Sequence, residues 1–253
     1  MRFRPCIDLH DGKVKQIVGA TLESGNLAEN FISERSAGDY ARLFARDNLP
    51  GGHVIMLGKG CEAAAKEALA AYPGGLQIGG GIRAENAAGY LQAGASHVIV
   101  TSAAFRDGQL SLEAIAEISQ VVGREHLVLD LSCVPVDGGY RVAANRWKTV
   151  TETAVTPALL TELEAWCDEF LIHAVAVEGR KEGPDLALAA MLADYARHGN
   201  AVTYAGGLAS EADLDQFFAA SDGVLDYTIG SALDLYGGTL AYTALAARSA
   251  RGI

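Results

Sequence analysis

The sequence lacks the features that mark secreted, membrane-bound or multidomain proteins. No run of about 18 apolar residues is uninterrupted, so no transmembrane helix is predicted. Met1-Arg2-Phe3-Arg4 leads directly into an apolar stretch without the succession of regions typical of a signal peptide, and we expect a cytoplasmic protein. There is no Pro/Ser-rich connector and no low-complexity segment, which predicts one domain over residues 1–253.

Cysteine is scarce, and the usual metal, nucleophile and cofactor motifs are missing. The cysteines at positions 6, 61, 133 and 167 stand far apart without Cys-x-x-Cys spacing, which favours structural thiols over a metal site. The chain also lacks a Gly-x-Ser-x-Gly nucleophile and a Gly-x-Gly-x-x-Gly dinucleotide fingerprint. We therefore expect no metal and no cofactor, and an isomerisation by proton transfer rather than hydride transfer or metal-dependent hydrolysis.

Basic residues are outnumbered, 20 against 31 acidic residues, for a net charge of −11. This balance argues against a nucleic-acid or anionic-membrane partner. An anionic small molecule is not excluded, because N–H groups at helix N-termini bind phosphate locally and more remote charge is screened beyond about 8 Å.

What the chain does contain is a repeat of its own features. Asp8 and Asp130 each end a short apolar run, and each is followed by the same succession of two turns rich in small residues. After Asp8 come Gly79-Gly80-Gly81-Ile82 and Val100-Thr101-Ser102-Ala103; after Asp130 come Ala205-Gly206-Gly207-Leu208 and Ile229-Gly230-Ser231-Ala232. Self-similarity on this scale predicts two similar halves, at about 1–123 and 124–253.

Short β-branched runs alternate with amphipathic stretches, a pattern typical of parallel βα units. Strands are predicted around Ile7, Ile55, Gln77, Ile99, Leu129, Ile172, Thr203 and Thr228, and helices near 37–48, 62–72, 84–93, 110–120, 157–168, 185–198, 210–220 and 239–250. Eight units in this length predict an α/β fold, a single (β/α)8 barrel with two-fold repeated half-barrels. The alternative is an open doubly wound sheet. Barrel closure would place the ends of strands 1 and 5, and with them Asp8 and Asp130, across one mouth.

The glycine turns predict two phosphate sites. In barrels the turns after strands 7 and 8 often bind phosphate, and a matching pair after strands 3 and 4 implies a second phosphate on the opposite rim. Arg83 adds a guanidinium to the first site only, because Ala209 takes its place in the repeat. The predicted phosphate-binding residues are Gly80, Gly81, Arg83, Thr101 and Ser102 in the first half and Gly206, Gly207, Gly230 and Ser231 in the second.

The two aspartates are the predicted catalytic pair. Aspartate is unfavourable in an apolar strand and expensive to bury without a partner. Two equivalent aspartates that face one mouth are better explained as a general acid and a general base. The residues alone do not decide which of Asp8 and Asp130 is the acid.

Two long connections, residues 11–36 and 132–156, occupy equivalent places in the repeat, and long loops of this kind often cover a site. Residues 12–19 alternate as a small hairpin would. In the second connection, Trp147 is predicted to stack on a planar ligand, while Trp166 is assigned to the fifth helix. His173 is a candidate to reach the mouth, the alternative being a strand histidine with its hydrogen bonds satisfied inside the protein, and Glu178-Gly179 is a lesser candidate.

The motifs together resemble a known family. They are Cys6-Ile7-Asp8-Leu9-His10-Asp11-Gly12-Lys13-Val14-Lys15-Gln16, His53-Val54-Ile55, Gly79-Gly80-Gly81-Ile82, Val128-Leu129-Asp130-Leu131-Ser132, Phe170-Leu171-Ile172-His173-Ala174 and Tyr204-Ala205-Gly206-Gly207. Over nearly its whole length the chain resembles the phosphoribosylformimino-5-aminoimidazole carboxamide ribotide isomerases of histidine biosynthesis, in their fungal and plant branch. The resemblance implies an Amadori rearrangement of a small bis-phosphorylated ribotide without a cofactor, with Asp130 as the acid and Asp8 as the base. We expect the protein to be a monomer.

Three other functions are alternatives. The cyclase subunit of imidazole glycerol phosphate synthase is a similar barrel with the same aspartates, but His10 stands where cyclases tend to have lysine. A phosphoribosylanthranilate isomerase would need one phosphate site rather than two. A barrel that binds phosphosugars without turnover would need the glycine turns but not both aspartates.

Overall fold

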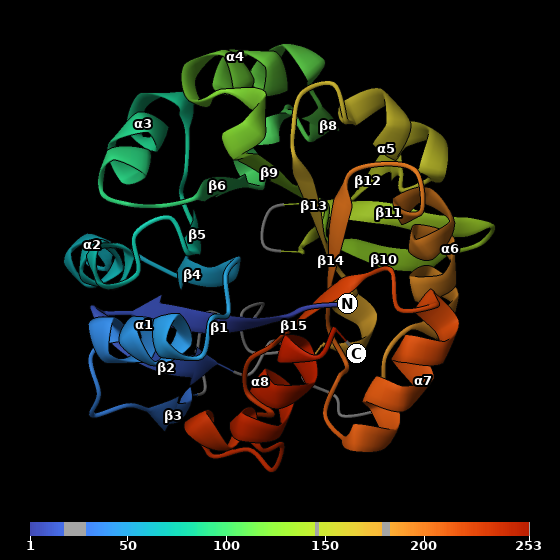
Figure 1. Cartoon of the computed structure of the whole chain (residues 1–253). Helices are drawn as coiled ribbons and strands as arrows, with labels where there is room; N and C mark the ends of the chain where they lie inside the picture. The colour runs from blue at the N-terminus through green and yellow to red at the C-terminus, as the bar shows by residue number, and fades with distance from the viewer. Residues whose placement is uncertain (18–28, 145–146, 179–182, 253) are drawn as a thin grey trace.

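The computed structural model of the chain describes residues 1–17, 29–144, 147–178 and 183–252. In this part of the chain eight parallel strands form a ring, in which each strand pairs with its neighbour and the last pairs with the first through Phe3 and Tyr227 (Figure 1). The strands are β1 (Phe3–His10), β4 (Gly52–Met56), β5 (Leu76–Gly79), β6 (His97–Val100), β9 (Leu127–Asp130), β13 (Glu169–His173), β14 (Ala201–Ala205) and β15 (Asp226–Ile229). Closure confirms the predicted (β/α)8 barrel and excludes the open sheet.

Eight α-helices of the described residues surround the strands (Figure 1). They are α1 (Ala37–Arg46), α2 (Glu62–Ala71), α3 (Ala84–Gln92), α4 (Leu112–Val122), α5 (Pro157–Leu163), α6 (Leu186–Ala196), α7 (Glu211–Ser221) and α8 (Tyr242–Ala250). Side-chain caps begin several of them, as at Ser210, whose hydroxyl accepts from the Asp213 N–H. None of the helices in the described ranges is long and apolar enough to cross a membrane.

One predicted helix boundary is wrong. The assignment of Trp166 to the fifth helix fails because α5 ends at Leu163. The carbonyl of Glu164, which a further helical turn would use, instead accepts from Arg124 Nε at 2.9 Å. Asn200 Nδ2 donates to the same carbonyl at 3.4 Å. Arg124 and Asn200 lie far from α5 in the sequence, so the residues of the helix alone could not predict where it ends.

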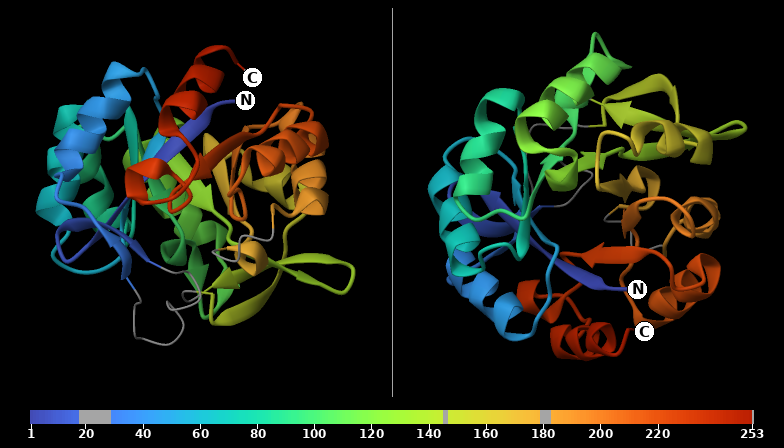
Figure 2. Two further views of the ribbon diagram at one scale, coloured as in Figure 1. Left: turned by 90° about the horizontal axis from the view of Figure 1, so that it is seen from below. Right: turned by 45° about the horizontal axis from the view of Figure 1, so that its top comes forward.

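Extra strands occupy both long connections, at the end of the barrel opposite the two termini (Figure 2, left). The predicted hairpin within 12–19 is wrong in its pairing. Residues Lys13–Ile17 form β2, which pairs back onto β1, and the turn is Asp11-Gly12, where both φ angles are positive as a type I′ turn requires. β3 (Glu29–Ile32) continues this sheet, and residues 18–28 lie outside the described part.

The second connection is a small sheet rather than a loop. β10 (Cys133–Val136), β11 (Gly139–Ala144) and β12 (Thr149–Ala154) pair in antiparallel order, and β10 and β11 project from the barrel (Figures 1 and 2). β7 (Phe105–Arg106) and β8 (Gln109–Leu110) form a short hairpin after β6. Short 3-10 turns η2 (Ser102–Ala104), η3 (Arg124–His126), η4 (Val175–Val177) and η5 (Asp234–Tyr236) complete the described elements.

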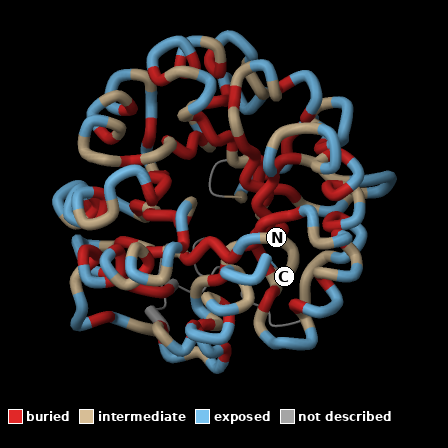
Figure 3. Tube along the Cα trace, viewed as in Figure 1, coloured by how far each residue is buried: buried red, intermediate tan, exposed pale blue. Residues whose placement is uncertain are grey.

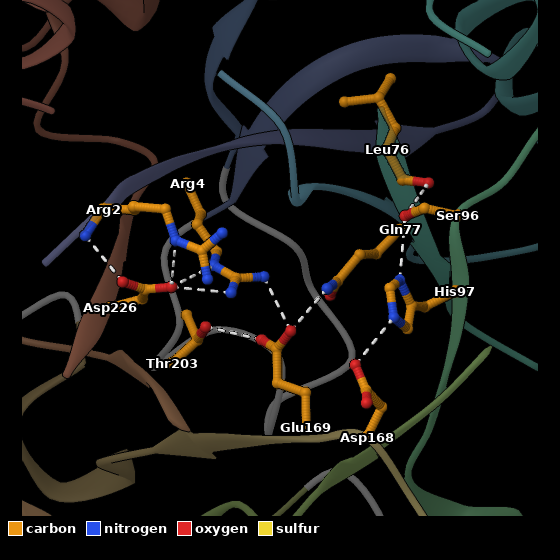
Figure 4. Close-up of polar contacts among 10 residues, drawn as sticks. All are labelled: Arg2, Arg4, Leu76, Gln77, Ser96, His97, Asp168, Glu169, Thr203 and Asp226. Atoms are coloured by element: carbon orange, nitrogen blue, oxygen red, sulfur yellow. Dashed lines mark hydrogen bonds and ion pairs between the residues drawn. The ribbon is translucent and has the colours of Figure 1, made fainter. Parts of the chain in front are cut away.

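Burial follows the layers of the barrel: buried residues gather on the strands and on the inner faces of the helices, and the outer faces are exposed (Figure 3). A polar network fills the barrel near the N-terminal ends of its strands (Figure 4). Arg4 Nη1 donates to Glu169 Oε2 and Nη2 to Asp226 Oδ2, each at 2.7 Å. Gln77 and Thr203 donate to Glu169 at 2.8 and 2.6 Å. The network closes this end, so the site must open at the other.

Candidate active site

A cavity of about 1100 Å³ opens where the barrel strands end. Its lining includes the thirteen main residues predicted to act in the site: Asp8, Gly80, Gly81, Arg83, Thr101, Ser102, Asp130, Trp147, His173, Gly206, Gly207, Gly230 and Ser231. Of the lesser candidates, Glu178 also lines the cavity, and Gly179 lies outside the described residues. The positions come from strands throughout the barrel, and the two glycine-turn pairs come from its two halves. One cavity therefore holds both carboxylates and both predicted phosphate sites.

Asp130 is the last residue of β9 and is held by two hydroxyl groups. Thr101 donates to Oδ2 and Ser132 to Oδ1, each at 3.0 Å. Burial raises the pKa of the Asp130 carboxyl, against the lowering effects of His173 and the two hydroxyls. Ser132 lies two positions beyond Asp130, so a period-of-two pattern along the extended chain could have predicted this contact.

Asp8 has a different environment. The Cys6 thiol, two residues earlier on the same face of β1, donates to Asp8 Oδ1 at 2.9 Å. Burial raises the pKa of Asp8 to about 6, while the Cys6 thiol, His173 and Gln16 oppose the rise. Burial also raises the pKa of the thiol well above its usual value, so Cys6 acts as a neutral donor. A carboxyl with this pKa can exchange a proton near neutral pH.

His173 lies close enough to both carboxylates to interact electrostatically with each. Its Nε2 pairs with Glu178 Oε2 at 3.0 Å, and the Trp147 and His173 rings pack in a T-shaped arrangement with their centres 4.9 Å apart. Burial alone would lower the pKa of His173, but the charges of Glu178, Asp130 and Asp8 raise it overall. Glu178 therefore belongs with the site, and Trp147 packs against His173.

The glycine turns of the two halves match in backbone conformation. Gly80 and Gly206 have φ angles of 92° and 114°. A Cβ atom at Gly80 would lie 2.0 Å from the Met56 carbonyl oxygen, and one at Gly206 would lie 2.8 Å from that of Ala174. Each glycine thus lets its turn pack against the end of the preceding strand, and each turn leads toward the N-terminus of a helix, α3 or α7.

His53 is a cavity residue that was not predicted to act in the site. It lies on β4, is 2% exposed, and its Nε2 has no hydrogen-bond partner among the described residues. Burial, followed by the charges of Arg4 and His173, lowers its pKa to about 3, so the ring is neutral. A histidine inside the apolar strand Gly52–Met56 was the sequence feature that could have predicted this cavity residue.

No group of side chains in the described ranges could hold a metal ion.

The architecture and the cavity define a (β/α)8 barrel in which two carboxyl groups line one cavity. A family model described as histidine biosynthesis protein matches residues 2–241, and the chain belongs to this family. Among its relatives, the Medicago truncatula protein named 1-(5-phosphoribosyl)-5-((5-phosphoribosylamino)methylideneamino)imidazole-4-carboxamide isomerase, chloroplastic, is 47% identical over 250 residues, which cover 96% of this chain and 80% of the relative.

Fungal relatives carry the same isomerase name. The Yarrowia lipolytica protein is 46% identical over 245 residues, which cover 94% of this chain and 93% of the relative. The Eremothecium gossypii protein is 48% identical over 249 residues, with 94% of each chain covered. The predicted resemblance to the fungal and plant isomerases is thereby confirmed, whereas the roles of individual residues stay predictions.

Proposed function

We propose that this protein is the isomerase that converts the aminoaldose form of the bis-phosphorylated imidazole carboxamide ribotide into its aminoketose in histidine biosynthesis. The observation that carries the proposal is one cavity that holds both carboxylates between two matching glycine turns. Relatives that match nearly the whole chain bear this isomerase name. Turnover of the aminoaldose by the purified protein, without ammonia, tests the proposal.

The two carboxylates suffice for the proton transfers. Asp130 protonates the ring oxygen of the sugar, the bond from that oxygen to C1 breaks, and a Schiff base forms at C1. Asp8 then removes the proton from C2, which gives an enolamine. Protonation of C1 by Asp8 and return of the C2 hydroxyl proton to Asp130 complete the ketose. Each aspartate ends in its starting state, so the reaction needs no redox partner.

We propose that the paired phosphate turns orient the substrate across the mouth. Backbone N–H groups at glycine turns that lead into helix N-termini bind phosphate without requiring cationic side chains. Arg83 and Lys59 line the cavity on the first-half side and add positive charge there.

We also expect a monomer in the cytoplasm, although the name of the Medicago relative assigns that protein to the chloroplast.

Crystals grown in phosphate or sulfate should contain two anions in the cavity, one beside Gly81 and Ser102 and the other beside Gly207 and Ser231. Both turns line the same cavity and share their backbone geometry, so both should fill. Electron density measures occupancy. An anion at the second turn alone, even at saturating concentration, would instead favour a substrate with a single phosphate.

Trp147→Ala should weaken substrate binding and slow turnover more than a surface substitution does. The indole already packs against His173, and a flat apolar ring excludes water from a Schiff base. The lost stacking corresponds to about 0.5–1.5 kcal/mol, or roughly 2- to 12-fold in affinity. Trp147 fluorescence should also change on binding. Wild-type kinetics in the variant, with the fluorescence change retained, would assign the signal to Trp166.

The pH dependence of kcat/KM should report the ionisation of Asp8. Since the base must be ionised and the pKa of Asp8 is about 6, kcat/KM should fall about tenfold per pH unit below that value. Cys6→Ala should move this acidic limb to higher pH, because donation by the thiol favours the carboxylate. An acidic limb that stays at the same pH in Cys6→Ala would mean that another group controls it.

A further inference from the structure

Gln16 is a buried polar side chain beside Asp8. It lies on β2, opposite Phe31 of β3, is 3% exposed and lines the same cavity as Asp8. The amide donates toward Asp8 and so lowers the pKa of that carboxyl. Even so, its Nε2 has no hydrogen-bond partner of normal geometry among the described residues. A primary amide buried in this way destabilises the fold unless a ligand or water completes its hydrogen bonds.

The repeat indicates why an amide is there. In the first half, Thr101 donates to Asp130 from the neighbouring strand. The equivalent residue beside Asp8 is Gly230, which has no side chain. A Cβ atom at Gly230 would lie 2.9 Å from Gln16 Oε1, so the glutamine fills the space that a threonine would need. Gln16 thus lies between Asp8 and the turn at Gly230. Its amide has two N–H donors beside Asp8, where Asp130 has the single hydroxyl of Thr101.

We propose that Gln16 Nε2 binds a hydroxyl oxygen of the sugar chain that runs from the phosphate at Gly230 and Ser231 to the carbon beside Asp8. This inference rests on the proposed isomerase function and adds a substrate-binding residue to it. An oxygen acceptor is required because the amide nitrogen can only donate. The contact would hold the reacting carbon against the Asp8 carboxylate.

Gln16→Met tests the proposal, because methionine has a similar length and shape but no donor. The expected kcat/KM is about 5- to 10-fold below wild type, as for loss of one hydrogen bond. Stability to urea should be unchanged or higher, because an unsatisfied amide is replaced by an apolar group. Lower activity without lower stability would not arise from a residue with only a structural role. Gln120→Met, on an exposed position of α4, is the matched control and should leave both quantities unchanged.

A crystal structure with the aminoketose product gives an independent answer. Gln16 Nε2 should lie within about 3.2 Å of a sugar hydroxyl oxygen. Wild-type kcat/KM in Gln16→Met, or a product complex in which Nε2 faces only water or protein, would overturn the inference while leaving the isomerase function intact. A wild-type protein that does not turn over the aminoaldose would instead overturn the proposed function, and this inference with it.

Discussion

Replacing either Asp8 or Asp130 by asparagine is expected to lower kcat by about 10²- to 10⁴-fold, the usual contribution of a general acid or base. Asparagine keeps the shape of the side chain but can neither give nor accept the proton at the pH of the assay. Both carboxyls are buried in the cavity with raised pKa values, as proton exchange requires. Steady-state kinetics with the aminoaldose measure kcat, and product binding by calorimetry shows whether the site is intact.

The matched control is Asp194→Asn, an exposed aspartate on α6 that pairs with Arg197 at the surface. It should retain wild-type kcat, because it lies on an outer helix. If both site variants kept near-normal kcat, the assignment of the pair as acid and base would be wrong. If only one of them did, the remaining aspartate would have to serve both roles, and the two halves of the barrel would not be equivalent in function.

Arg4→Met is expected to lower the free energy of unfolding by about 3–5 kcal/mol, the usual loss when one partner of a buried ion pair is removed. Arg4 is 3% exposed and neutralises two buried acids, so its loss leaves Glu169 without a cation. For a barrel of this size, the melting temperature should fall by roughly 10 °C. Urea unfolding followed by circular dichroism measures the change.

Arg2→Met provides an internal comparison, because Arg2 pairs with the same Asp226 while its side chain is 56% exposed. An exposed pair contributes about 0–1 kcal/mol, so this variant should remain close to wild type. Equal stability of the two variants would show that the buried network contributes no more than a surface pair. Adding Glu169→Gln to Arg4→Met should restore part of the loss, because it removes the unpaired charge.

The barrel could be predicted because its signals are local and repeated. Apolar strands alternate with amphipathic helices, and the two aspartates and the four turns predicted to bind phosphate recur in the same order. Parallel strands that close a ring bring their C-terminal ends to one mouth, so the position of a residue at a strand end was enough to place it in the cavity. The two aspartates and the residues of the turns that follow the strands reach the cavity for this reason, whereas Trp147 comes from the connection between β11 and β12.

The features of the fold and the site that could not be predicted depend on contacts between segments far apart in the chain. The end of α5 is set by Arg124 and Asn200, and the hairpin after β1 pairs back onto that strand instead of within itself. Hydroxyl donation from Thr101 to Asp130 crosses from one strand to the next. Gln16 and His53 are buried by segments that lie far from them in the sequence. No pattern of neighbouring residues carries this information.

Incubation of the purified protein with the aminoaldose ribotide alone, followed by chromatographic separation of the products, tests the proposed function most directly. A parallel reaction contains the aminoketose and ammonia. The proposed isomerase should convert the aminoaldose to the aminoketose in the first reaction and leave the aminoketose uncyclised in the second. Ammonia-dependent consumption of the aminoketose, with no conversion of the aminoaldose, would contradict the isomerase and identify a cyclase.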